Sequence, residues 1–335
     1  MKRRDFIRLG AGLGAAGLAT GLTHPSPAAA QTKAVFKASD VQPPGYPTVV
    51  ATESFGKKLE AATDGRLSVR MYPSMQLGGE KETIEQTQIG AVQLLRVSAG
   101  ALGPIVDDIN VVNMPFLFRD TAHAEKMMDG PLGQELLDKI TANANAGLVA
   151  LCWMSAGARS LYNIKRPIKS IDDIKGLKFR VIGNPIFIDM MNALGGNGIA
   201  MGYDQVFSAL QTGVIDGAEN NPPSYVFSNH YTAAKYLSLT EHLVIPEVLV
   251  FSKKTWATLS QDDQTLIKKL AREAQLEQRD LWNKYQQEAV DKAQAAGCQI
   301  TEIADKKPFQ NAVKPVWDKY GPKYQDTINR IQTIT

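Results

Sequence analysis

One uninterrupted helical segment near the end of the chain constrains the fold more than any other feature. The segment SQDDQTLIKKLAREAQLEQRDLWNKYQQEAVDKAQAAG opens at Ser260 with a Ser-x-x-Asp cap, contains no proline and stops at Gly297. At 1.5 Å per residue it is on the order of 54 Å long, which exceeds the width of one small domain. Its apolar positions do not keep the heptad of a coiled coil; they are Leu266, Leu270, Ala274, Leu281 and Tyr285. We therefore expect a helix that lies across two domains.

Strand-like and helix-like segments alternate along the rest of the chain. Strands are expected in AVFKASD, DGRLSVRMYP, VQLLRV, GLVALCWM and GLKFRV, and helices at residues 48–62 and 80–89. Such alternation predicts an α/β fold with helices on both faces of the sheets. Because 335 residues exceed the usual size of one domain, we expect two domains.

The first thirty residues predict an export signal. KRRDFIRLG supplies a basic region, LGAGLGAAGLATGL a weakly apolar run too short to span a bilayer, and PAAAQ a small-residue cleavage site. Arg3, Arg4 and Phe6 resemble a twin-arginine (Tat) signal, although Lys2 stands where Ser or Thr usually precedes the arginine pair. We expect a signal peptide over residues 1–30, cleavage after Ala30 and a periplasmic protein.

The charge of the chain gives no support to nucleic acid or anionic membranes as partners. The formal net charge of +3 is concentrated in the first thirty residues, and residues 31–335 carry 33 basic and 33 acidic side chains. A balanced chain of this kind produces no long-range field that would attract a polyanion.

Only two cysteines are present, Cys152 and Cys298, and each lies in an apolar, strand-like run. Export would permit a disulfide between them, whereas two buried free thiols are the simpler alternative, which we favour. Neither cysteine has metal-ligating neighbours at a suitable spacing, so no metal site is expected from them.

The sequence contains none of the common catalytic motifs. There is no G-x-S-x-G elbow, no H-E-x-x-H, no Walker loop and no Cys/His cluster with metal-ligand spacing, and only His123, His230 and His242 follow the export signal. The sequence therefore supplies no positive evidence for catalysis, and we expect neither enzymatic activity nor a cofactor. An exported hydrolase that acts on a carboxylated substrate ranks second.

Three arginines lie in apolar or glycine-bounded surroundings: Arg96 in QLLRVSAG, Arg159 in SAGARSLYN and Arg180 in GLKFRV. For a single arginine, a solvated edge charge or a structural ion pair is the usual explanation. A guanidinium keeps its charge and presents a planar fork, so burial beside a cleft is favourable when a carboxylate pairs with it through two parallel hydrogen bonds. The three arginines together therefore favour an organic acid as ligand.

Two long stretches, GARSLYNIKRPIKSIDDIKGLKFRV and GYDQVFSALQTGVIDGAENNPPSYVFSNHYTAAKYLSLTEH, resemble the solute-binding receptors of TRAP transporters, the DctP-type family. The resemblance covers essentially the whole chain after the export signal and is most specific in LQTGVIDGAEN. It implies the two-domain α/β periplasmic-binding-protein fold, with a hinge, a bridging helix and a ligand trapped between the domains. On this basis domain I is expected at 31–156 plus 246–285, and domain II at 157–245 plus 286–335.

The same resemblance assigns three ligand-binding residues. Arg180 matches the family arginine that clamps the ligand carboxylate, and Arg159 matches a second arginine at the cleft. Asn220, in DGAEN, matches a polar residue that donates to the ligand.

Four further residues are candidates with open alternatives. Arg96 departs from the small or acidic residue of many family members, so it could contact a longer ligand or form an ion pair within domain I. Glu80 could accept a sugar hydroxyl or complement the N-terminus of its helix. Asn184 and Tyr46 could line the cleft or serve turns and packing.

The groups beyond the first carboxylate decide which acid is bound. A second carboxylate requires a second cationic fork, whereas a sugar requires mixed donors and acceptors beside an apolar wall. Glu80 would repel a second anionic group while accepting hydroxyl hydrogens, although Arg96 could equally serve a second carboxylate. VQPPGYPTV, LLRVSAGALGP and GAENNPPSYVFSNHY also resemble the branch of the family that binds uronic and related sugar acids.

The resemblance therefore implies a receptor for a six-carbon sugar acid such as glucuronate or galacturonate, in preference to a C4-dicarboxylate such as succinate or malate. The expected partners are the small and large membrane subunits of a TRAP permease, with the receptor itself a monomer.

Overall fold

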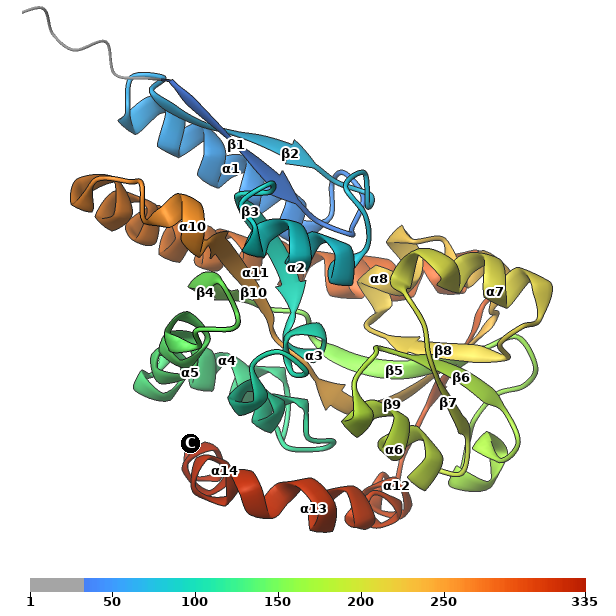
Figure 1. Cartoon of the computed structure of the whole chain (residues 1–335). Coiled ribbons are helices and arrows are strands. Elements are labelled where there is room, and N and C mark those ends of the chain that lie inside the picture. Colours follow the sequence, from blue (N-terminus) through green and yellow to red (C-terminus); the bar gives the residue numbers. More distant parts are fainter. Residues whose placement is uncertain (1–32) are drawn as a thin grey trace, which may run out of the picture. The chain divides into compact units, whose positions relative to one another are not determined.

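The computed structural model describes residues 33–335, so the predicted signal peptide and its cleavage site lie outside the described residues. These residues contain two β-sheets with helices packed against them (Figure 1). The α/β fold class predicted from the alternation of segments is confirmed.

The first sheet has the strand order β2-β1-β3-β10-β4. Its strands are β1 (Ala34–Ser39), β2 (Leu67–Tyr72), β3 (Leu94–Ser98), β4 (Leu148–Met154) and β10 (Glu247–Ser252). β1 runs parallel to β2 and β3, whereas β10 runs antiparallel to β3 and β4. Because β3, β4 and β10 are buried along their whole lengths, their sequences are nearly continuous apolar runs.

The second sheet has the strand order β11-β9-β5-β8-β6-β7. Its strands are β5 (Ala158–Asn163), β6 (Lys178–Val181), β7 (Asn197–Ala200), β8 (Gly217–Asn220), β9 (Tyr236–Val244) and β11 (Gln299–Glu302). β5 is antiparallel to β8 and β9, while β6 is parallel to β7 and β8, and β9 is parallel to β11.

The helices fall into three groups along the chain. Before β4 lie α1 (Pro47–Ala62), α2 (Glu80–Gln88), α3 (Ala99–Leu102), the 3-10 helix η1 (Asp107–Asn113), α4 (Thr121–Asp129) and α5 (Pro131–Ala142). Between β5 and β9 lie the 3-10 helices η2 (Ile171–Ile174) and η3 (Tyr203–Gln205), with α6 (Pro185–Ala193), α7 (Val206–Thr212), α8 (Pro222–Phe227) and α9 (His230–Ala233). After β10 lie α10 (Lys253–Trp256), α11 (Gln261–Ala295), α12 (Lys307–Ala312), α13 (Lys314–Tyr320), the 3-10 helix η4 (Gly321–Tyr324) and α14 (Gln325–Gln332).

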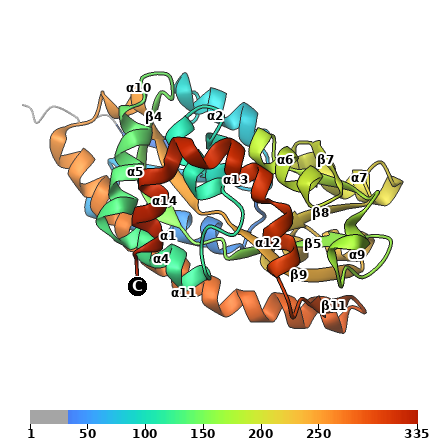
Figure 2. The ribbon, with the colours of Figure 1, turned by 90° about the horizontal axis from the view of Figure 1, so that it is seen from below.

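The long helix α11 contains 35 residues and contacts elements of both sheets. The predicted N-terminal cap is confirmed, because the Ser260 hydroxyl accepts the N–H of Asp263 at 3.1 Å. The helix packs on α1 and β4 and, further along, on α8 and β11; Figure 2 shows it continuing to the β11 end of the second sheet. This is the expected bridging helix.

The chain passes directly between the two sheets at residues 155–157 and 245–246, which are the connections β4–β5 and β9–β10, and a third time through α10 and α11 between β10 and β11. The Gln278 side chain of α11 accepts from the N–H of Ser155 and donates to its carbonyl, both at 2.8 Å, and so fixes the first connection. The domain boundaries expected after residues 156 and 245 fall in these connections. The division itself stays a prediction, and the C-terminal helices contact both groups of elements: α13 packs on α6, and Arg330 of α14 pairs with Glu135 of α5.

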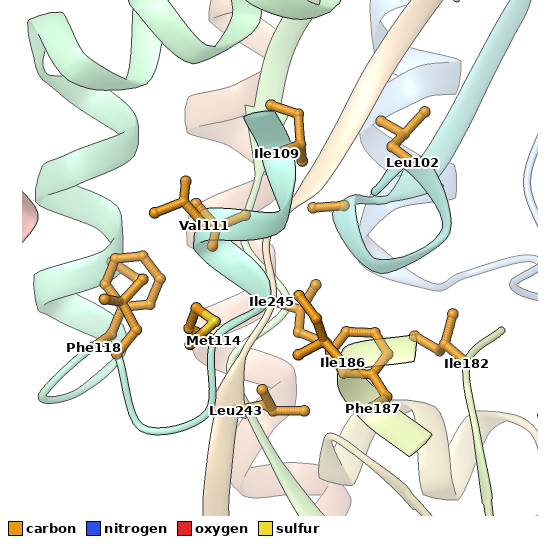
Figure 3. Packing of buried hydrophobic residues seen from close by; sticks show 14 of the residues in the cluster. Leu102, Ile109, Val111, Met114, Phe118, Ile182, Ile186, Phe187, Leu243 and Ile245 are labelled. Atoms are coloured by element: carbon orange, nitrogen blue, oxygen red, sulfur yellow. The ribbon is translucent and has the colours of Figure 1, made fainter. Parts of the chain in front are cut away.

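The largest hydrophobic cluster joins side chains from both sheets and from the helices between them. Figure 3 shows Ile186 and Phe187 of α6 close to Ile245 at the second connection, with Met114 next to η1 nearby. Fully burying such a side chain contributes about 1.5–3 kcal/mol to the stability of the fold. The cluster therefore stabilises the packing of α3, η1 and α6 against the strands.

Cys152 and Cys298 are both buried and unbonded to each other, which confirms the two free thiols. Burial raises the pKa of the Cys152 thiol to about 12, so it stays protonated and unreactive at neutral pH. Among residues 33–335, no helix has the length and apolar character needed to cross a membrane.

Candidate ligand-binding site

Polar side chains gather where the strands of the first sheet end. β1 and β3 are parallel, with Ser39 opposite Leu95, which brings Asp40, directly after β1, level with Arg96 near the end of β3. β10 runs the opposite way, so its first residue, Glu247, pairs with Ser98. Arg96 lies two residues earlier on β3, and Glu80 begins α2.

The second sheet brings a matching group to one of its own edges. Asn220 ends β8 and lies opposite Ser160, so the neighbouring Arg159 at the start of β5 comes to the same edge. β6 runs parallel to β8, with Arg180 opposite Ala218. The directions and pairing of the strands therefore bring Arg159, Arg180 and Asn220 to the same edge of the second sheet.

Two adjoining cavities lie among these residues. The inner one has the lining Val41, Gln42, Glu80, Arg96, Ser98, Arg159, Arg180, Ile182, Tyr203, Asn220, Ser224 and Glu247. The outer one has a volume of about 940 Å³ and shares Glu80, Arg180, Ile182 and Tyr203 with the inner one. The inner cavity has a volume of only about 20 Å³, so the outer one supplies nearly all the space, and together they have the mixed polar and apolar lining that suits a small polar ligand.

Arg180 is the buried cation without a carboxylate partner. Its side chain is 3% exposed, its Nε donates to the carbonyl of Met201 at 2.8 Å, and its guanidinium lies 5.6 Å from the centre of the Tyr203 ring. Within residues 33–335 no carboxylate oxygen lies within 4.0 Å of it, and its two Nη atoms have no acceptor. Burial accordingly lowers the pKa of Arg180. A carboxylate brought to these Nη atoms would compensate a charge that the described chain leaves uncompensated.

Arg159 differs because its charge is already compensated. Its Nε and Nη2 hold the Glu219 carboxylate at 2.6 and 2.9 Å, and its Nη1 donates to Oδ1 of Asn220 at 2.8 Å. Burial opposes the charge on Glu219, but the Arg159 guanidinium and the neighbouring His242 together outweigh it and lower the pKa of Glu219 to about 2. Arg159 therefore fixes Asn220, whose side-chain nitrogen is left as a donor.

Arg96 is surrounded by acidic groups. Its Nε donates to Asp40 at 2.9 Å, its Nη2 also reaches Asp40, and its Nη1 donates to Glu247 at 2.7 Å. Glu80 lies 3.7 Å from the same Nη1 and accepts the N–H of Ser98 at 2.8 Å. The ion-pair alternative for Arg96 is thus realised in the structure, although both Arg96 and Glu80 line the cavity.

Tyr46 and Asn184 are absent from the lining of both cavities. The hydroxyl of Tyr46 shares a 2.9 Å hydrogen bond with Ser224, which does line the inner cavity. Asn184 caps α6 and donates to Gly100 and Asn110 at 3.1 and 2.9 Å. Both side chains support the site from behind, and direct ligand contact by either stays a prediction.

Several lining residues escaped the sequence reasoning: Gln42, Ser98, Tyr203, Ser224 and Glu247. Glu247 carried a usable signal, because an acidic residue opening the buried run EVLVFS requires a cationic partner. The others are ordinary polar residues of turns and helix ends, and only the fold brings them to the cavity.

Comparison with known proteins gives a consistent result. The family model for bacterial extracellular solute-binding protein, family 7, matches residues 38–323. A relative named solute-binding protein from Chromohalobacter salexigens is 40% identical over 296 residues, covering 88% of this chain and 87% of its own.

Two similar crystal structures contain sugar acids. A TRAP periplasmic solute-binding protein from Pseudomonas putida F1 with bound D-glucuronate has 53% identity and a TM-score of 0.88, covering 90% of this chain and 98% of its own. One from Bradyrhizobium sp. BTAi1 in complex with α/β-D-galacturonate has 43% identity and a TM-score of 0.86, covering 89% of this chain and 99% of its own.

Proposed function

We propose that this chain, which belongs to bacterial extracellular solute-binding protein family 7, binds a six-carbon sugar acid such as D-glucuronate or D-galacturonate. It is a solute receptor of the TRAP type. The observation that carries the ligand class is the uncompensated, buried guanidinium of Arg180 on the wall of both cavities.

The carboxylate of the ligand pairs with the two Nη atoms of Arg180 in this proposal. A bidentate pair fits because the Nε of Arg180 is already held by Met201 and the guanidinium plane is set beside the Tyr203 ring. Asn220, oriented by Arg159, donates a further hydrogen bond. Arg96 and Glu80 face the rest of the ligand as cavity-lining residues.

A sugar acid fits the remaining lining better than a C4-dicarboxylate. Tyr203 and Ile182 provide an aromatic and an apolar surface, while Gln42, Ser98 and Ser224 provide hydroxyl and amide groups for sugar hydroxyls. The bound D-glucuronate and D-galacturonate of the two similar structures support the same choice. A C4-dicarboxylate is the alternative ligand.

The receptor passes its ligand unchanged to the small and large membrane subunits of a TRAP permease and acts as a periplasmic monomer in this proposal. Recovery of a chemically altered ligand after incubation would favour the hydrolase alternative. Export depends on Arg3 and Arg4, so replacing both with Lys should leave precursor in the cytoplasm, and normal export of that variant would refute the Tat signal.

Competitive calorimetric titration tests the ligand assignment. D-Glucuronate and D-galacturonate should bind at least about tenfold more tightly than succinate or malate, a difference of about 1.4 kcal/mol in binding free energy. Equal or reversed affinities would refute the sugar-acid assignment and leave the receptor class intact.

A further inference from the structure

On the side of the first sheet, the inner cavity is lined by Arg96, Glu80 and Glu247, and the buried carboxylate of Asp40 lies behind Arg96. Asp40 and Glu247 accept hydrogen bonds from Arg96, and Glu80 lies 3.7 Å from its Nη1. The side chains of Arg96, Asp40, Glu80 and Glu247 are at most 13% exposed, so water screens these charges weakly. We call these four residues the Arg96 cluster.

The opposite wall, contributed by the second sheet, carries more positive than negative charge. Arg159 is compensated by Glu219, and Arg180 has no carboxylate within 4.0 Å among residues 33–335. One end of the cavity therefore carries an excess positive charge and the other an excess of carboxylates. A ligand with one carboxylate has a single favourable orientation, with the acid at Arg180 and the remaining groups at the Arg96 cluster.

Three of the five N–H groups of Arg96, one on each nitrogen, are already used by carboxylates of the protein. Its Nε and both Nη atoms already donate to Asp40 or Glu247. Burial and the neighbouring Glu80 raise the pKa of Glu247, whereas Arg96 opposes that change without overcoming it. A second anionic group would therefore approach a site where negative charge is already in excess.

The same wall is well supplied with hydrogen-bond acceptors. Oε1 of Gln42 is buried without a hydrogen-bond partner in the described chain, while its Nε2 donates to Ser224 at 3.2 Å. The carboxylates of Glu80 and Glu247 also border the cavity. Acceptors of this kind suit ligand hydroxyl groups, which donate hydrogen bonds, and disfavour carboxylates, which only accept them.

We propose that the Arg96 cluster is a specificity determinant that admits monocarboxylic sugar acids and rejects dicarboxylic sugar acids of the same length. This proposal rests on the proposed function, since it takes Arg180 as the carboxylate site. Arg96 thus acts by holding the carboxylates in place, and Glu80 and Glu247 supply the repulsion.

Three ligands distinguish the effect of a second carboxylate from the effect of a closed sugar ring: D-glucuronate, D-gluconate and D-glucarate. The last two are open six-carbon chains that differ only in whether the second end carries a hydroxyl or a carboxylate. In calorimetric titration of the full receptor, D-gluconate should bind at least about tenfold more tightly than D-glucarate. Glu247→Gln keeps the shape of the side chain and removes a charge. It should therefore reduce the preference for D-gluconate over D-glucarate, measured as the ratio of their affinities, by at least about fivefold.

Glu80→Gln provides a second variant with the same expected effect, should Glu247→Gln fold poorly as judged by its thermal melting curve. Glu135→Gln is the matched control, because Glu135 is exposed on α5 and pairs with Arg330 away from the cavity. This control should leave the D-gluconate to D-glucarate ratio unchanged.

The outcomes distinguish the two proposals. If the wild type binds D-glucuronate but binds D-gluconate and D-glucarate equally, or if folded Glu247→Gln and Glu80→Gln both keep the wild-type ratio, the specificity role is refuted and the sugar-acid function stands. If the wild type binds no D-glucuronate, the proposed function fails, and the specificity role fails with it.

Discussion

In our proposal ligand binding depends most directly on Arg180, because its two Nη atoms have no acceptor among residues 33–335. Arg180→Lys keeps the charge but loses the planar fork. We expect binding of D-glucuronate to weaken by about 1.5–3 kcal/mol, the range for hydrogen bonds to charged groups. This corresponds to roughly 10- to 150-fold in the dissociation constant, measurable by calorimetry.

Arg330→Lys is the matched control for this substitution. Arg330 lies on α14, is 43% exposed and pairs with Glu135, so its replacement should leave affinity unchanged. Unchanged affinity in a folded Arg180→Lys protein would show that Arg180 has only a structural role.

Glu219 makes a second prediction at the residue scale, on stability. Its pKa is lowered to about 2 in the folded protein, because the Arg159 guanidinium and His242 together outweigh the effect of burial. A lowered carboxyl pKa adds stability above the unfolded value and loses it as the pH falls towards the folded value. With an unfolded pKa near 4.5, the contribution is on the order of 3 kcal/mol at pH 7, of which about 2 kcal/mol is lost by pH 3.

Denaturant unfolding of wild type and Glu219→Gln at pH 7 and pH 3 measures this contribution. Breaking a buried ion pair costs about 3–5 kcal/mol, so the variant should be much less stable at pH 7, and the difference should shrink at pH 3. The exposed Glu135→Gln should cost less than about 1 kcal/mol. A difference between wild type and Glu219→Gln that does not change with pH would contradict the assignment.

The three arginines were recognisable in the sequence as cations in apolar surroundings, but their roles were not. Arg96 and its partner Glu247 are 151 positions apart in the sequence, and Arg159 and Glu219 are 60 positions apart. The carboxylate that neutralises each arginine is therefore determined by strand pairing. Local pattern identifies a buried charge, and only the fold shows whether that charge is compensated.

At the scale of elements, Gly157 in the β4–β5 connection is a position that other residues cannot occupy easily. Its φ is +60°, and a Cβ there would lie 2.9 Å from Trp282 and Gln286 of α11. Gly157→Ala should therefore destabilise the fold in two ways. The left-handed backbone costs about 1–2 kcal/mol, and overpacking against α11 costs about 1–3 kcal/mol. Denaturant unfolding should show a loss of about 2–5 kcal/mol.

Gly213→Ala separates the two contributions. Gly213 has a similar φ of +72°, but a Cβ there meets no atom within 4 Å. Only the backbone cost should remain, about 1–2 kcal/mol. Equal losses for the two variants would show that the close approach of α11 to the connection is unimportant.

The same scale shows which elements the sequence can predict. α11 was predictable because its cap, its length and its lack of proline are local properties. β8, with the sequence GAEN, has no apolar alternation and is a strand because it pairs with β5 and β6 on either side. Short polar strands of this kind depend on tertiary pairing, and β8 carries one of the site residues, Asn220.

At the scale of the whole molecule, direct hydrogen bonds join segments of the two sheets around the cavity. Gln42 and Tyr46, which follow β1, bond to Ser224 of α8 at 3.2 and 2.9 Å. Asn184, at the start of α6, bonds to Asn110 of η1 at 2.9 Å. These hydrogen bonds join segments of the two sheets, and the proposed ligand contacts do the same. A movement of one sheet away from the other would therefore break all of these contacts at once.

We therefore expect D-glucuronate to favour a more compact state of the receptor. In our proposal the ligand contacts Arg180 on one wall and the Arg96 cluster on the other, and both sets of contacts can form only when the walls are close. The radius of gyration from small-angle scattering should decrease on saturation. Asn110→Ala removes the bond to Asn184 together with the hydrogen bonds of Asn110 to Gly103 and Asn113. In a variant that folds as judged by its melting curve, loss of the Asn184 bond should weaken binding by about 0.5–1.5 kcal/mol, or roughly 2- to 12-fold. If saturation leaves the scattering unchanged and Asn110→Ala binds like wild type, then the two walls do not move relative to each other, and the affinity is set by a preformed cavity alone.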